Sequence, residues 1–114
     1  MERIILDTDT GTDVDDVMAV ALAALSPELK LDRITTVYGD VDLRSRMVVK
    51  VLKLLGREDI PAMAGSRDVL LRNREIWWLG HEGEGYLTPE SENLRYVSRH
   101  AVDFNIDTVM SNPG

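Results

Sequence analysis

The residues with the clearest chemical potential are five aspartates that lie within ten positions near the start of the chain. They are Asp7, Asp9, Asp13, Asp15 and Asp16. Carboxylates this close together repel one another and disfavour ionisation unless positive charge lies among them. Oxygen ligands suit calcium or magnesium, whereas zinc or copper would recruit histidine or cysteine. The cluster therefore predicts a divalent cation site, and the alternative is a solvated turn whose acids cap a helix.

A strand should lead into this cluster. Residues 3–6 form a nearly continuous apolar segment, which predicts a strand buried on both faces of a parallel sheet. Asp7 and Asp9 lie two residues apart at the end of this segment, so both side chains should leave the same side of the strand. Gly11 then allows the chain to turn tightly. The acids should therefore gather at the carboxyl end of the first strand.

A helix should follow over residues 14–25, where apolar residues surround nearly the whole circumference. Thr12 or Asp13 is the expected N-cap. Asp15 and Asp16 fall in the first turn, where the helix macrodipole and the free backbone N–H groups favour negative charge. A helix that is apolar nearly all round must be covered on more than one side.

Strand and helix signals go on alternating along the chain. Residues 34–38 are β-branched or aromatic throughout and predict a second strand. A second helix should start near Asp42 and stop at Gly56, and residues 60–64 should form a short third strand. The basic residues of this helix are expected on its solvated face: Arg44, Arg46, Lys50 and Lys53. The alternation predicts an α/β domain with right-handed crossovers and a parallel sheet.

Regular periodicity lapses over residues 65–88, and a loop of this length in a compact domain is usually functional or mobile. Glycines and aromatic residues surround His81, a composition that suits a flap over a planar ligand. The alternative is that Trp77 and Trp78 fill the core beside a surface turn.

A third helix should follow residues 89–92. Its apolar residues share one widened stripe: Leu94, Val97, Ala101, Val102, Phe104, Ile106 and Val109. His100, which has charged neighbours on this helix, is expected to be a surface residue.

The charge of the chain is unevenly distributed. Residues 1–42 contain ten acidic and three basic residues, whereas residues 43–114 contain ten of each, so the formal charge of −7 belongs to the first part. This asymmetry supports a cation site and argues against nucleic acid and anionic membranes as partners. The chain has no cysteine, no signal-peptide pattern, and no apolar run long enough to span a bilayer. We therefore expect one small cytoplasmic domain.

The acidic cluster also carries a resemblance. The segment Asp-Thr-Asp-Thr-Gly-Thr-Asp-Val-Asp-Asp at residues 7–16 resembles the N-terminal signature of the inosine-uridine-type nucleoside hydrolases, which are calcium-dependent N-ribohydrolases. That signature is usually Asp-x-Asp-Pro-Gly-x-Asp-Asp-Ala. This chain has Thr10 in place of the proline, two extra residues before the Asp-Asp pair, and Val17 in place of the alanine. The resemblance continues with supporting segments up to the Asn-Pro-Gly at residues 112–114.

For the metal, the resemblance implies a calcium ion held by Asp9 and Asp16. The two extra residues leave an alternative, in which Asp13 takes a ligand role because it lies at the family's distance from Asp9. Asp7 would then orient the ligands through hydrogen bonds. Because metal ligands need such supporting partners, all four positions belong to the expected calcium site.

For the substrate, the resemblance implies a ribonucleoside, hydrolysed at its N-glycosidic bond to ribose and free base. Asp15 would contact the sugar and take a proton from the attacking water. Asp40 occupies the position of a sugar-contacting asparagine, and His81 matches an active-site histidine although Gly80-His81 stands in reverse order to the family's His-Gly. The nucleobase is not specified by these residues.

The implied fold is the doubly wound parallel sheet of the nucleoside hydrolases, which is Rossmann-like. Family members continue well beyond residue 114, so residues 1–114 are expected to be an N-terminal fragment of one longer α/β domain. A fragment with unpaired edges and apolar faces is expected to form homo-oligomers.

Two other functions fit part of the pattern. Haloacid-dehalogenase-like phosphotransferases share the strand followed by Asp7-x-Asp9, but they need a threonine where this chain has Gly11. A non-catalytic module that binds calcium and ribose is the alternative outside the enzymes.

Overall fold

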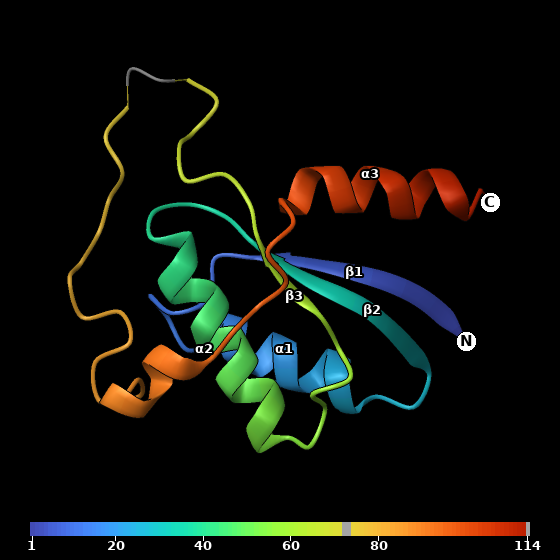
Figure 1. The fold of residues 1–114 in the computed structure, drawn as a ribbon, viewed down its shortest axis with the longest axis horizontal. Helices are drawn as coiled ribbons and strands as arrows, with labels where there is room; N and C mark the ends of the chain where they lie inside the picture. Colours follow the sequence, from blue (N-terminus) through green and yellow to red (C-terminus); the bar gives the residue numbers. More distant parts are fainter. Residues whose placement is uncertain (72–73, 114) are drawn as a thin grey trace.

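The computed structural model describes residues 1–71 and 74–113, which form a parallel sheet with helices on both faces (Figure 1). The elements in chain order are β1 (Glu2–Thr8), α1 (Asp15–Leu25), β2 (Leu29–Thr36), α2 (Val41–Leu54), β3 (Ala62–Ala64), the 3₁₀ helix η1 (Pro89–Asn93) and α3 (Ala101–Ser111). Within the described residues the strand order is β1-β2-β3, and both neighbouring pairs are parallel. The expected α/β class and parallel sheet are confirmed.

Helices cover both faces of the sheet. Helices α1 and α2 lie on one face, and α3 runs along the other (Figure 1). The alternation of side chains along β2 agrees with this arrangement, because Ile34 is buried in the core beneath α1 and α2 whereas Arg33 points the other way. The Arg33 guanidinium lies 3.9 Å from the centroid of the Phe104 ring on α3. The two-sided layering of a doubly wound sheet is therefore present.

The core lies between the sheet and the pair of helices α1 and α2. Its buried members come from both helices, from β2, and from β3 and the turn before it: Val20, Ala23, Ala24, Leu31, Ile34, Val48, Val51, Leu52, Ile60 and Ala62. Ile4 and Leu6 of β1 are partly buried against them. Burying such side chains contributes about 1.5–3 kcal/mol each for the larger aliphatic ones. This packing fixes the carboxyl end of β1, from which the acidic segment extends.

Two helix starts differ from those expected. Val14 is the N-cap of α1 and makes no side-chain capping bond, so neither Thr12 nor Asp13 caps this helix. The N-cap of α2 is Asp40, two residues before the expected start, and its carboxylate accepts a hydrogen bond from the Leu43 N–H at 2.9 Å. The Thr12 hydroxyl makes its hydrogen bonds with Glu82 and Arg44 instead of with the start of α1.

Helix α1 is covered on one side by the described residues. Val20, Ala23 and Ala24 are buried, whereas Leu22 and Leu25 on the outer face are exposed. The expectation that this helix is covered on more than one side is therefore wrong for the part of the chain that the structure describes.

The third helix starts later than expected. Residues 89–93 form only a short 3₁₀ turn, in which the Ser91 hydroxyl accepts a bond from the Thr88 N–H at 2.9 Å. The chain then extends, and the Val97 N–H donates to the carbonyl of Ala62 in β3 at 2.9 Å. Leu94 and Val97 are therefore not helical: Leu94 ends η1 in an extended conformation, and Val97 pairs with β3. His100 is exposed as expected and caps α3, which begins at the next residue.

Residues 65–71 and 74–88 contain no helix or strand, in agreement with the lapse of periodicity (Figure 1). In the described parts of the chain, none of the helices is both long enough and apolar enough to cross a membrane.

Candidate active site

Residues 9–14, which we call the acidic loop, leave the carboxyl end of β1 and lead into α1. Gly11 has a φ of 123°, a conformation that favours glycine, and a Cβ here would lie 2.8 Å from the Met47 sulfur. Thr10 is fully buried, and its hydroxyl is 2.8 Å from that of Thr8. The backbone of the loop is therefore held closely against α2.

Asp9 and Asp16 come together at this end of β1, as predicted. A side-chain hydrogen bond with Asp9 raises the pKa of Asp16 above its ordinary value, and partial burial and the charge of Asp9 raise it further. The Thr8 hydroxyl donates to Asp16 Oδ2 at 2.9 Å and opposes this shift. Two carboxyl groups in contact at a partly buried position are a pair that positive charge would stabilise.

The other predicted acids of the cluster lie apart from this pair. Asp15 is exposed in the first turn of α1, and Asp13 is exposed in the acidic loop. Asp7 accepts a hydrogen bond from the Thr35 hydroxyl at 2.5 Å across the β1–β2 ladder. Among residues 1–71 and 74–113, no three histidine, cysteine, aspartate or glutamate side chains gather closely enough to hold a metal ion.

Arg44 is the residue that sequence reasoning placed wrongly. It is 1% exposed, so it does not belong to the solvated face of α2. Its Nη1 donates to the carbonyl oxygens of Asp9 at 2.5 Å and Thr10 at 2.9 Å, and its Nε donates to the Tyr38 carbonyl at 2.7 Å. A guanidinium with fixed donors can hold several carbonyls at once, so Arg44 joins the acidic loop to the end of β2.

A signal for the burial of Arg44 was present in the sequence. The residue lies three positions before Met47 and four before Val48, both of which are buried on the inner face of α2. Helical spacing therefore put Arg44 on the apolar stripe, where an arginine needs several acceptors.

His81 lies beside the acidic loop. Its Nε2 is 3.0 Å from the Thr12 carbonyl oxygen, and the ring is otherwise exposed. Glu82 follows it and is 7% exposed. Burial alone would raise the pKa of Glu82, but hydrogen bonds from Thr12 and from backbone N–H groups outweigh burial and hold the pKa below its ordinary value. Glu82 was not singled out from the sequence, because nothing in its neighbourhood distinguishes it from a solvated loop acid.

The two tryptophans do not both fill the core. Trp77 is exposed, whereas Trp78 is half-buried with its ring centroid 4.8 Å from the Arg44 guanidinium carbon. A Cβ at Gly39 would lie 2.7 Å from the Trp78 ring, so this ring packs on the turn after β2. Asp40 follows this turn and lines, with Trp78, a hollow of about 460 Å³.

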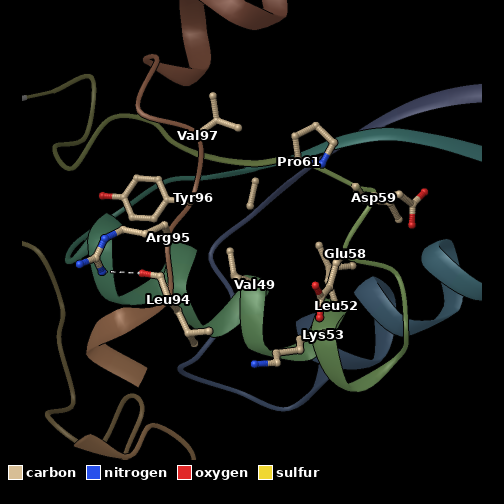
Figure 2. Close-up of a pocket in the computed structure, with 12 residues that line it drawn as sticks. Val49, Leu52, Lys53, Glu58, Asp59, Pro61, Leu94, Arg95, Tyr96 and Val97 are labelled. Carbon is tan, nitrogen blue, oxygen red and sulfur yellow. Dashed lines mark hydrogen bonds between the residues drawn. The ribbon is translucent and has the colours of Figure 1, made fainter. Parts of the chain in front are cut away.

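A second hollow lies away from these residues. Figure 2 shows it between α2, β3 and residues 94–97, and its volume is about 480 Å³. Its lining includes Ile60 and Pro61, which precede β3, so it opens near the amino end of that strand. In a parallel sheet this is the end opposite the acidic loop, and none of the predicted site residues lines it.

Comparison with known proteins identifies the family of the chain. The family model of the inosine-uridine preferring nucleoside hydrolases matches residues 4–114. The chain belongs to this family. The nucleoside hydrolase signature seen in the acidic cluster is therefore confirmed, and the dehalogenase-like alternative is excluded.

Individual nucleoside hydrolases agree with this assignment. The inosine-uridine preferring nucleoside hydrolase of Crithidia fasciculata is 38% identical over 117 residues, and uridine nucleosidase 1 of Arabidopsis thaliana is 37% identical over 118 residues. These matches cover 96% and 99% of this chain but 36% and 34% of the two relatives. Among solved structures, a plant nucleoside hydrolase matches with a TM-score of 0.80 at 32% identity, covering 98% of this chain and 36% of that one. The chain thus spans about a third of the length of the nucleoside hydrolases it matches.

Proposed function

We propose that residues 1–114 form the N-terminal part of a calcium-dependent nucleoside N-ribohydrolase, which cleaves ribonucleosides to ribose and free base. The observation that carries this proposal is the pairing of Asp9 with Asp16 at the carboxyl end of β1, in a chain that belongs to the nucleoside hydrolases. Ligands of open α/β sheets bind beyond the carboxyl ends of the strands, which is where this pair lies.

The residues present fit a calcium ion as part of its ligand set. Asp9 and Asp16 offer hard oxygen ligands, and the hydrogen bond with Asp9 that raises the pKa of Asp16 is consistent with the two carboxyls lying in contact. We assign these two residues as ligands and keep Asp13, exposed on the same loop, as the alternative ligand. Calcium, when bound, supplies positive charge that orients the ribose hydroxyls and favours deprotonation of water.

In this proposal Asp15 contacts the sugar and takes the proton of the water that attacks the anomeric carbon. The new C–O bond forms as the C–N bond breaks, and the electron pair of that bond leaves with the base, which takes up a proton. The transition state has oxocarbenium character, so the nearby carboxylates stabilise it electrostatically. His81, whose ring contacts the Thr12 carbonyl of the acidic loop, is the candidate for contact with the departing base.

Asp40 and Asp7 would have supporting roles. Asp40 lines a hollow beside Trp78, and we propose that it contacts the ribose. Its carboxylate already accepts the Leu43 N–H, and an ionised carboxylate has no hydrogen to donate to the sugar. Asp7 is fixed by Thr35 and would orient the neighbouring ligands rather than touch substrate. The cytoplasmic location and the absence of nucleic-acid and membrane partners stay predictions.

A ribose-release assay with inosine and uridine, in the presence of calcium, tests the proposal on the full-length protein, because we expect residues 1–114 alone to be incomplete for hydrolysis. Asp15→Asn should abolish release, because the base that accepts the proton is lost. Asp103→Asn is the matched control, since Asp103 is likewise an acid in the first turn of a helix. Calcium-dependent binding of nucleoside without any release of ribose would instead favour the non-catalytic binding module.

A further inference from the structure

A directed series of hydrogen bonds runs from α2 through the acidic loop to the residues around His81. Arg44 Nη2 donates to the Thr12 hydroxyl at 3.1 Å, and this hydroxyl donates to Glu82 Oε1 at 3.1 Å. Arg44 is almost fully buried, so its end of the series is fixed by the packing of α2. The Thr12 hydroxyl has one hydrogen, and with Arg44 donating to its oxygen that hydrogen is directed at the carboxylate.

The Glu82 carboxylate also organises its own segment. Its Oε2 accepts the Gly80 N–H at 2.9 Å and its Oε1 accepts the Leu79 N–H at 3.3 Å. One buried carboxylate thus closes the turn over residues 79–82 and bonds that turn to the acidic loop. A carboxylate that accepts several donors is held more firmly than a neutral amide would be.

His81 lies at the point that this network fixes. Its Nε2 is 3.0 Å from the Thr12 carbonyl, and because a carbonyl only accepts, the hydrogen of a neutral ring must reside on Nε2. Thr12 therefore bonds to both neighbours in the turn, His81 through its carbonyl and Glu82 through its hydroxyl.

We propose that Glu82 is a positioning residue: together with Thr12 and Arg44 it docks residues 79–82 on the acidic loop, which carries the candidate calcium ligand Asp9, and fixes the orientation and tautomer of His81 on that loop. The consequence for turnover rests on the nucleoside hydrolase function proposed above, whereas the docking itself does not. A simpler role for Glu82, in which it closes only its own turn, predicts that Thr12 has no influence on His81.

Nuclear magnetic resonance of the histidine rings separates these roles. The chain has two histidines, and His100, the N-cap of α3, serves as an internal reference far from Thr12 in the sequence. At a pH well above the ordinary imidazole pKa, the nitrogen shifts should show His81 in the Nε2–H tautomer. Glu82→Gln and Thr12→Val should each return His81 to the tautomer mixture of a solvated ring and leave His100 unchanged.

Two matched variants act as controls. Glu84→Gln removes the same charge from an exposed position two residues further on and should leave both rings unchanged. Thr12→Ser keeps the hydroxyl and should keep the His81 tautomer. If Glu82→Gln unfolds the chain, His100 will change as well, and Thr12→Val then decides the question.

The proposal is overturned if the His81 signals of Thr12→Val match those of the unmodified chain, or if Glu84→Gln has the same effect as Glu82→Gln. Where ribose release is measurable, Glu82→Gln should lower kcat more than it raises KM, because a mispositioned group costs most in the transition state. Loss of docking in a full-length protein that releases no ribose would still support the positioning role and would count against the hydrolase function alone.

Discussion

The proximity of Asp9 and Asp16 has an electrostatic cost that a cation would remove. The hydrogen bond with Asp9 and partial burial raise the pKa of Asp16, so ionising Asp16 beside Asp9 is unfavourable in the free chain. A divalent ion bound to the pair would offset this cost and favour the folded state, since only that state brings β1 and the start of α1 together.

Calcium should therefore raise the melting temperature of the chain. Binding to the folded state alone contributes about 2.7 kcal/mol when calcium is at 100 times its Kd. Asp9→Asn or Asp16→Asn should remove most of this shift. Asp13→Asn should keep it if the adjacent residues Asp15 and Asp16 are the functional pair. Melting curves in EDTA and in millimolar calcium provide the measurement. Identical melting curves of the unmodified chain in EDTA and in calcium would contradict a calcium site in these residues. If only Asp13→Asn loses the calcium-dependent shift, Asp13 rather than Asp16 is the ligand.

Arg44 should matter more for stability than any other charged residue of α2. Replacing it by methionine leaves the carbonyls of Asp9, Thr10 and Tyr38 without their donor, and each buried unsatisfied acceptor costs about 1–3 kcal/mol. We expect Arg44→Met to lower the free energy of unfolding by about 3 kcal/mol, a value reduced by water that enters the site.

Arg46→Met is the control for Arg44, because Arg46 on the same helix makes an ion pair with Asp42 four residues earlier. Such surface pairs contribute about 0.5 kcal/mol, so its effect should be small. Urea unfolding of both variants measures the difference. Equal losses would show that Arg44 is not the link between the acidic loop and β2.

At the scale of secondary structure, Asp40 at the start of α2 has two roles: it caps the helix, and we propose that it contacts the ribose. Asp40 caps this helix, and removing a cap costs about 1 kcal/mol. Asp40→Ala should lower the free energy of unfolding by about this amount, whereas Asp40→Asn should change it by less than about 0.5 kcal/mol because asparagine caps equally well. Thermal or urea unfolding tests this ranking, and a stabilising Asp40→Ala would rule out the cap.

The first half of the chain was predictable because each element carries its own signal there. The apolar run before Asp7 and the Ala-rich helix form the elements that their sequence predicts. Residues 34–38 also mark a strand, but β2 begins earlier, at Leu29, and ends at Thr36. The predicted ends of the elements were less accurate, as the N-cap of α2 shows. Asp40 and Asp42 are chemically equivalent as caps, and the position of the turn at Gly39 makes Asp40 the cap.

The second half was less predictable because long-range contacts decide it. Leu94 and Val97 fit a helical stripe, yet Val97 pairs with β3, a contact between residues more than thirty positions apart in sequence that no local pattern reveals. The same holds in the site: the pairing of Asp9 with Asp16 follows from local geometry, whereas the bonds of Glu82 to Thr12 depend on where a long loop returns.

Across the whole molecule, two apolar helix faces lie on opposite sides of the sheet and remain exposed in the described residues (Figure 1). Their exposed members are Val14, Met18, Leu22 and Leu25 at α1, and Val102, Ile106, Val109 and Met110 on α3. Burying one such side chain fully contributes about 1.5–3 kcal/mol, so a contact between two copies could outweigh the loss of translational freedom. The net charge of −7 opposes the contact.

We therefore expect the chain to form dimers or larger oligomers, and to form them more readily as salt is added. The Debye length falls from about 30 Å at 0.01 M to about 8 Å at 0.15 M salt, which screens repulsion between copies but not the burial of apolar side chains. Light scattering over a range of chain and salt concentrations measures the association. Leu22→Glu or Ile106→Glu should weaken it, because each places a charge within an apolar face, whereas Ser98→Glu adds the same charge at an exposed polar position and should not. A monomer at every salt and chain concentration would show that these faces do not bind a second copy, and association that weakens with salt would show that charge rather than apolar burial drives it.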